Sequence, residues 1–66
     1  MSVYKKIEVV GTSPTSFADA TRAAVEEAAK TMRHMSWFEV LEQRGAIRDG
    51  KVTEFQVTLR IGFRLE

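Results

Sequence analysis

The sequence predicts an α+β fold in which a three-stranded sheet packs on one amphipathic helix, in the order β-α-β-β. Three observations support this prediction: apolar and polar residues alternate in three segments, a helical pattern separates the first two, and an Asp-Gly pair separates the last two. The chain contains no linker, internal repeat or shift in composition. Residues 1–66 are therefore expected to form a single domain.

The first strand is predicted over residues 3–10. Apolar and polar side chains alternate there, and Lys5 is the one polar residue on the apolar side. Residues 11–14, with the sequence Gly-Thr-Ser-Pro, are expected to end the strand.

The helix is predicted to begin between residues 13 and 17 and to run for about five turns. Two starts compete: Ser13 precedes a proline suited to the first helical position, and Ser16 begins a sequence that resembles a capping box. Apolar residues, many of them alanine, then recur at helical spacing as far as Met35, which lets a sheet approach closely. Acidic residues come early and basic ones late, as the helix dipole favours.

The second strand is predicted from Trp37 to Ile47 and the third from Thr53 to the end of the chain, joined by a type I′ turn at Asp49-Gly50. A right-handed helical crossover makes the first two strands parallel. The long third strand then lies between them and antiparallel to both, so the predicted sheet order is 1-3-2.

The hairpin turn also predicts a register. Arg48 faces Lys51, and each following pair lies one residue further from the turn on both strands. The register places Phe38 and Val40 on the inner face, against the alanine stripe of the helix. A bulge near Gly45 would shift the later pairs. Four pairs are predicted on the outer face: Trp37 with Gly62, Glu39 with Arg60, Leu41 with Thr58, and Gln43 with Gln56.

Trp37 lies on a face that a single helix cannot cover, so it must meet water, another subunit or a ligand. The glycine opposite leaves open space beside the indole for a flat group. Burying an indole of about 200 Å² stabilises by at most roughly 5 kcal/mol at 25 cal/mol/Å². From the residues alone, Trp37 either packs into a neighbouring subunit or forms an aromatic stacking platform.

Gln56 presents an amide on the rigid central strand, and its donors and acceptor match the edge of a uracil-like or flavin-like ring. The alternative is an ordinary solvated side chain. Gln56 is six residues from Gly62, or about 20 Å along the strand. If one small ring contacts both Trp37 and Gln56, the two residues are expected to come from different subunits.

Length and composition exclude several classes of protein. A chain of 66 residues buries only about 60% of the surface that it exposes when unfolded, so oligomerisation is the expected supplement to its core. The chain has no cysteine and one histidine, so neither a disulfide nor a metal site is predicted. Its net charge of +1, with the two signs mixed along the chain, argues against nucleic acid as a partner.

The sequence offers little support for a membrane partner or for catalysis. No apolar run approaches the roughly 20 residues that span a bilayer, and the N-terminus lacks the apolar core of a signal peptide, so a cytoplasmic location is expected. His34 has no serine or cysteine partner suggested by spacing. The Gly11-Thr12-Ser13 stretch is a weak phosphate-binding signal that helix capping explains. The protein is not expected to be an enzyme.

Several short motifs, in their order and spacing, resemble those of the dodecins over nearly the whole chain. They are Val10-Gly11-Thr12-Ser13, Trp37-Phe38-Glu39-Val40, Arg44-Gly45, Phe55-Gln56-Val57 and Gly62-Phe63-Arg64-Leu65-Glu66. Dodecins are small strand-helix-strand-strand proteins that assemble into hollow spheres of twelve subunits and bind flavins in stacked pairs near subunit contacts. The resemblance implies a homododecamer with a flavin ligand.

The resemblance also implies three cofactor-binding residues. Trp37 corresponds to the tryptophan that stacks on the isoalloxazine ring, Gln56 to the glutamine that hydrogen-bonds its pyrimidine edge, and Arg44 to a basic residue that can hold an FMN phosphate. The balanced charge resembles bacterial members and favours FMN, with riboflavin, FAD and coenzyme A as other ligands of the family. The implied function is storage or sequestration of flavin, which limits flavin photochemistry. The alternative is a purely structural homo-oligomer.

Overall fold

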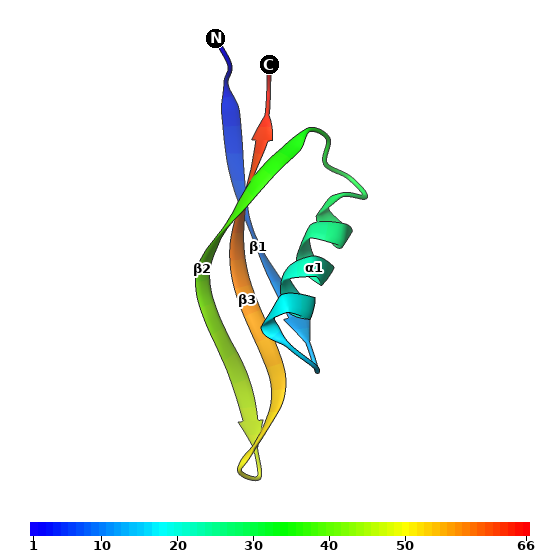
Figure 1. Ribbon diagram of the computed structural model, residues 1–66, viewed down its shortest axis with the longest axis vertical. Coiled ribbons are helices and arrows are strands. Elements are labelled where there is room, and N and C mark those ends of the chain that lie inside the picture. The colour runs from blue at the N-terminus through cyan, green and yellow to red at the C-terminus, as the bar shows by residue number, and fades with distance from the viewer.

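The computed structural model describes all 66 residues and confirms the predicted element order (Figure 1). Its elements are β1 (Tyr4–Ser13), α1 (Phe17–Ala28), β2 (Met35–Arg48) and β3 (Lys51–Arg64). The sheet order is β1-β3-β2, and β3 is antiparallel to both neighbours, as predicted. The Asp49-Gly50 turn has φ values of 52° and 75°, the two positive values that a type I′ turn requires.

Helix α1 starts at the later of the two predicted positions and is shorter than predicted. Ser16 is its N-cap, and the Ser16 Oγ accepts a hydrogen bond from the backbone N–H of Asp19 at 2.9 Å. The helix ends at Ala28, so the predicted extension to Met35 is wrong. Met35 is instead the first residue of β2, and His34 before it adopts a left-handed φ of 62° that redirects the chain. Pairing with the sheet therefore overrides the helical pattern, and the basic residues expected in the last turn lie beyond it.

The sequence predicted that the first strand ends at residue 10, but β1 continues through Gly11 to Ser13. The reason is packing, because Gly11 lies directly beneath α1. A Cβ atom at Gly11 would collide with the carbonyl oxygen of Ala20 and the methyl group of Ala24. The glycine thus permits close approach of helix and strand rather than breaking the strand.

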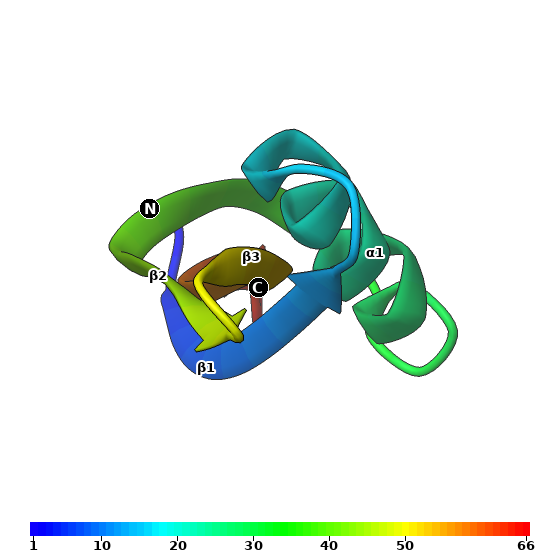
Figure 2. The same cartoon turned by 90° about the horizontal axis from the view of Figure 1, so that it is seen from below.

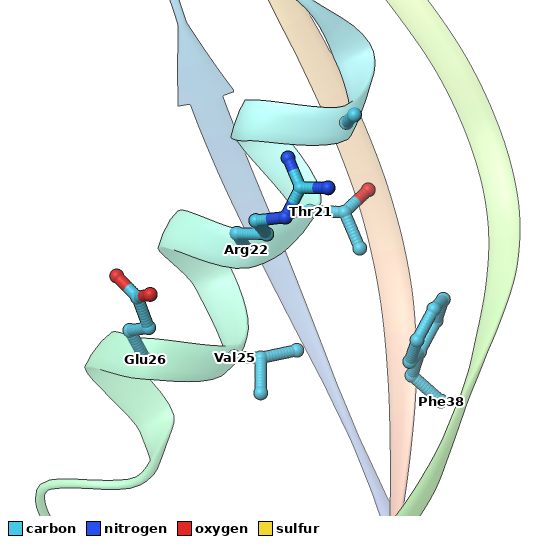
Figure 3. Close-up of a pocket in the computed structure, with 6 residues that line it drawn as sticks. Thr21, Arg22, Val25, Glu26 and Phe38 are labelled. Atoms are coloured by element: carbon cyan, nitrogen blue, oxygen red, sulfur yellow. The ribbon is translucent and has the colours of Figure 1, made fainter.

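Helix α1 packs on β1 and β3 and leaves β2 uncovered. Phe38 and Val40, predicted to pack against the alanine stripe, are instead 49% and 47% exposed. Figure 3 shows the Phe38 ring facing Val25 across a groove of about 500 Å³. The sheet is strongly curved (Figure 2), so a 12-residue helix covers two strands only. The core cluster consists of Ala20, Ala24, Val57 and Leu59.

The predicted register holds next to the turn, at Arg48 and Ile47, and again from Val40 to Trp37, but it is shifted by one residue between these two segments. Leu41 forms a bulge in β2, so Glu42 faces Thr58 and Arg44 faces Gln56. The predicted pairing of Leu41 with Thr58, and of Gln43 with Gln56, is therefore wrong. A second irregularity lies between Ala46 and Ile47, close to the bulge expected near Gly45. Because side chains alternate along a strand, the bulge at Leu41 transfers Arg44 to the outer face.

The isolated chain is elongated and poorly buried. Its Cα atoms extend over 52 × 20 × 13 Å with a radius of gyration of 13.6 Å, whereas a compact chain of this length has about 11 Å. Only eight residues are buried, and large apolar side chains such as Ile47 and Val52 remain exposed. The chain termini lie together at one end of the molecule and the β2–β3 hairpin at the other (Figure 1). No helix has both the length and the apolar character needed to cross a membrane.

Candidate functional site

The indole of Trp37 lies directly on the backbone of Gly62. A Cβ atom at Gly62 would collide with the Cδ2, Cε2 and Cζ2 atoms of the indole, so only glycine lets the ring rest on β3. The predicted open space beside the indole is therefore filled by the indole itself. Trp37 stays 39% exposed although Gly62 is buried. The ring thus has a supported side and a side that remains accessible.

Polar and aromatic groups from two strands surround the ring edge. Lys6 Nζ donates a hydrogen bond to Glu39 Oε1 at 2.7 Å, and Trp37 Nε1 donates to the same oxygen at 3.4 Å. The Tyr4 ring lies 5.2 Å from the Trp37 ring, centroid to centroid, at 59°. Lys6 and Trp37 both pair with Gly62, one from β1 and one from β2. The indole is consequently held across all three strands.

Glu39 is the electrostatic centre of this cluster. The hydrogen bond from Lys6, and after it the hydrogen bond from Trp37, hold the pKa of the Glu39 carboxyl below its ordinary value. The predicted facing of Glu39 and Arg60 is confirmed. The short ion pair of Glu39 nevertheless goes to Lys6, and Arg60 Nε lies 3.6 Å from an oxygen of Glu8.

Gln56 belongs to a second cluster on the same face. Arg44 Nε donates a hydrogen bond to Gln56 Oε1 at 2.7 Å, and Gln56 Nε2 donates to Glu54 Oε1 at 2.7 Å. The two contacts fix the orientation of the amide. The amide oxygen keeps a second lone pair and the NH₂ group a second hydrogen, so the amide can still exchange hydrogen bonds with a ligand edge.

The structure brings Arg44 and Gln56 together but leaves Trp37 apart from both. Gln56 and Gly62, on which Trp37 rests, are six residues apart on β3, which corresponds to about 20 Å. The register predicted from the turn would have placed Arg44 on the inner face, opposite Phe55. Arg44 lies between the irregularity at Ala46 and Ile47 and the bulge at Leu41, and the one-residue shift between them places it opposite Gln56.

Four contributors were not singled out from the sequence as site residues: Tyr4, Lys6, Glu39 and Glu54. Strand alternation places Tyr4, Lys6 and Glu39 on the face of Trp37, which was a usable signal. The missing information was the register of β1 against β3, which no hairpin turn determines.

The groove between α1 and β2 lies on the opposite side of the sheet and contains none of the predicted site residues. Figure 3 shows that it is bordered by Thr21, Arg22, Val25, Glu26 and Phe38. No group of three or more His, Cys, Asp or Glu side chains is placed to hold a metal ion. The outer sheet face is therefore the better candidate for a ligand site.

These features define a class of protein: a single small β-α-β-β domain that exposes much of its apolar surface. It presents an aromatic ring and a polar cluster on the sheet face that the helix does not cover. The chain belongs to the dodecin family, because the family model described as Dodecin matches residues 3–66. The resemblance noted in the sequence is thereby confirmed.

Individual relatives agree with this assignment. The chain is 55% identical over 64 residues to the dodecin of Thermus thermophilus, covering 97% of this chain and 93% of that protein. It is 38% identical over 66 residues to a protein of Mycobacterium tuberculosis named calcium dodecin, covering 98% and 92%. A crystal structure of a Thermus thermophilus protein matches with a TM-score of 0.94 at 53% identity, covering 100% of this chain and 97% of that one.

Proposed function

We propose that this protein is a non-enzymatic flavin-binding protein that stores and sequesters FMN in a homododecamer. The single observation that carries the proposal is the indole of Trp37, which is supported on one side by Gly62 and accessible on the other. Such a ring is suited to stack on the isoalloxazine system. Stacking also allows electron transfer to the excited flavin, which quenches it and limits its photochemistry.

Arg44 and Gln56 supply the polar part of the proposed site. The Gln56 amide offers both a donor and an acceptor to the pyrimidine edge of the flavin. The Arg44 guanidinium, 2.7 Å from the Gln56 oxygen, adds a cation of the kind that holds phosphate. This pairing favours FMN over riboflavin, which lacks the phosphate, and the larger FAD and coenzyme A are competitors in the same titration. The name of the Mycobacterium relative refers to calcium, but no carboxylate cluster supports a calcium site here.

The proposed assembly follows from what one chain leaves exposed. Tyr4, Phe38, Val40, Leu41 and Ile47 are all more than two-fifths exposed, and contacts between subunits would bury such residues. Trp37 and Gln56 lie too far apart in one chain to contact the same ring. We therefore place each flavin between Trp37 of one subunit and Gln56 of another.

Titration of the purified protein with FMN, followed by flavin fluorescence, tests the proposal. The parent should quench FMN, and Trp37→Ala should lose most of this quenching. Glu8→Ala is the control, because Glu8 lies on the same outer face, where it pairs with Arg60, and does not contact the indole. Light scattering should give the same oligomeric mass for all three. A parent that assembles but leaves FMN fluorescence unchanged would establish the alternative, a purely structural oligomer.

Mixing of subunits tests the division of the site between chains. Trp37→Ala and Gln56→Ala are each expected to bind FMN poorly. When the two variants are unfolded together and reassembled, a subset of sites receives an intact Trp37 from one chain and an intact Gln56 from another. Quenching should then recover in part. If mixing restores no quenching, both residues act within one chain or one of them is not part of the site.

A further inference from the structure

We propose that Glu39, held by Lys6, is a positioning residue that fixes the indole of Trp37 flat on Gly62 before any ligand binds. The effect of this positioning on ligand affinity rests on the proposed flavin function. The contacts that carry it, however, lie within a single chain.

The two hydrogen bonds to Glu39 differ in strength. The Lys6 ammonium lies 2.7 Å from Glu39 Oε1, whereas the Trp37 indole nitrogen lies 3.4 Å from the same atom. The shorter bond joins two charged groups and is the stronger one. Lys6 therefore sets the position of the carboxylate, and the carboxylate then orients the indole N–H.

The ring has three points of support, and each restricts a different motion. The backbone of Gly62 lies beneath it and prevents movement towards the sheet. Tyr4 lies beside it with a centroid distance of 5.2 Å and limits tilting. Only Glu39 contacts the N–H edge, so it selects between the two ways in which a flat indole could lie over a glycine. Without Glu39, the ring would remain near Gly62 but rotate.

Fixing the ring in advance favours binding because a ligand does not have to order the side chain. Ordering one such side chain corresponds to a change of about two- to tenfold in affinity. Loss of Glu39 should raise the Kd for FMN by that factor while leaving Trp37 and its ring intact.

Glu8 provides a matched control for the charge of Glu39. Both glutamates face Arg60 on the outer side of the sheet, Glu8 from β1 and Glu39 from β2. Glu8 pairs with Arg60 at 3.6 Å and is not hydrogen-bonded to the indole. Glu8→Ala removes the same charge from the same face without the N–H contact.

The experiment compares the parent with Glu39→Ala, Glu39→Gln and Glu8→Ala. The first readout is the indole N–H resonance of Trp37, the only tryptophan, together with its fluorescence anisotropy in ligand-free protein. Glu39→Ala should shift the resonance and lower the anisotropy, whereas Glu8→Ala should change neither. Glu39→Gln keeps an acceptor oxygen and should partly restore both signals. The second readout is FMN titration, with an increase in Kd of about two- to tenfold for Glu39→Ala.

A double-mutant comparison distinguishes action through the indole from direct action on the ligand. Phenylalanine has no N–H, so adding Glu39→Ala to Trp37→Phe should leave the Kd for FMN unchanged. An undiminished effect in that background would overturn the inference, as would equal effects of Glu8→Ala and Glu39→Ala or an unshifted indole resonance. If Glu39→Ala fails to assemble, Lys6→Met takes its place and should loosen the ring through the carboxylate. If the parent does not quench FMN, the proposed function fails, and the indole signals alone decide the positioning role.

Discussion

The two ends of the outer sheet face are built by different means. At one end, Trp37 rests on the backbone of Gly62, and its hydrogen-bonding and aromatic neighbours come from β1 and β2. At the other end, Gln56 is held by hydrogen bonds to Arg44 and Glu54. The aromatic end depends on the close approach of a ring to the main chain, and the polar end depends on paired side chains.

The difference can be traced to one residue, Leu41. From Trp37 to Val40, β2 alternates as a regular pleat requires, and Trp37 lies on the outer face. Leu41 adds one residue to β2 and reverses the faces beyond it, which turns Arg44 towards Gln56. The proposed ligand site thus includes a regular part of β2, at Trp37, and an irregular part, at Arg44. Mutations can therefore perturb the aromatic end and the polar end separately.

Deletion of Leu41 should have the largest effect. The deletion joins Val40 directly to Glu42, so Arg44 stays opposite Gln56, but β2 loses the bend and extra twist that the bulge introduces between the two ends of the site. FMN affinity should fall at least about tenfold, or 1.4 kcal/mol, and the stability of the chain should fall with it. Trp37 emission should stay close to that of the parent, because its pairing precedes the deletion. Parent-like FMN affinity in an assembled deletion variant would show that the bend at the bulge does not set the relative orientation of the two ends.

The same contrast explains how much the sequence could predict. The register predicted from the type I′ turn placed Trp37 correctly opposite Gly62, because the irregularity between Ala46 and Ile47 and the bulge at Leu41 shift the pairing in opposite directions and cancel. The bulge was not predictable, because an apolar Leu41 fits either face of a strand whose two faces both carry apolar groups.

Other departures arise from tertiary contacts rather than local pattern. The helical spacing continues to Met35, but Met35 pairs with Phe63 of β3 and is therefore part of the sheet. Alternation alone predicts that Phe38 and Val40 belong to the core. They are exposed because the sheet is curved and the short helix packs on β1 and β3 instead of β2. The three predicted site residues lie on the predicted outer face, except that Arg44 reaches it only through the bulge.

Gly62→Ala is expected to have the next largest effect, confined to the aromatic end. The new methyl group would occupy the position of the indole carbons, so the ring must leave the sheet. Overpacking of this kind costs about 1–3 kcal/mol. FMN quenching should be strongly weakened and Trp37 emission should shift to longer wavelength, while Gln56 and Arg44 remain paired. Gly50→Ala is a poor comparison because Gly50 needs its positive φ, so Thr58→Ala on the same face serves as control. An unchanged Trp37 spectrum would refute the packing argument.

Arg44→Ala should have a smaller effect, confined to the polar end. It removes one hydrogen bond to the Gln56 amide, which corresponds to about 1 kcal/mol, and it removes the proposed phosphate contact. The Kd should rise more for FMN than for riboflavin, and the difference should shrink at high salt. Arg48→Ala, on the same strand next to the turn, is the matched control. Equal losses for FMN and riboflavin would argue against a phosphate contact.

The smallest expected effect is a local change at acid pH. Hydrogen bonds from Lys6 and then Trp37 lower the pKa of Glu39 from its ordinary value of 4.5. A carboxyl whose pKa is lower in the folded state adds stability above its unfolded pKa and loses it as the pH falls through the folded value. As the pH falls below 4.5, the contact of the indole N–H with Glu39 should therefore weaken and the ring should loosen on Gly62 while the fold persists.

Fluorescence of Trp37 from pH 7 to pH 3 measures this loosening of the ring, and far-UV circular dichroism follows the fold in parallel. Asp19 complicates a global measurement, because hydrogen bonds from Thr15 and then the Ser16 cap also lower its pKa, so the start of α1 loses stability over the same acid range. The tryptophan signal isolates the sheet, since Asp19 lies on the helix. In Glu39→Gln the acid transition of Trp37 should disappear while that of the helix remains. An identical tryptophan transition in parent and variant would show that Glu39 does not control the ring, and the aromatic end would then depend on Gly62 and Tyr4 alone.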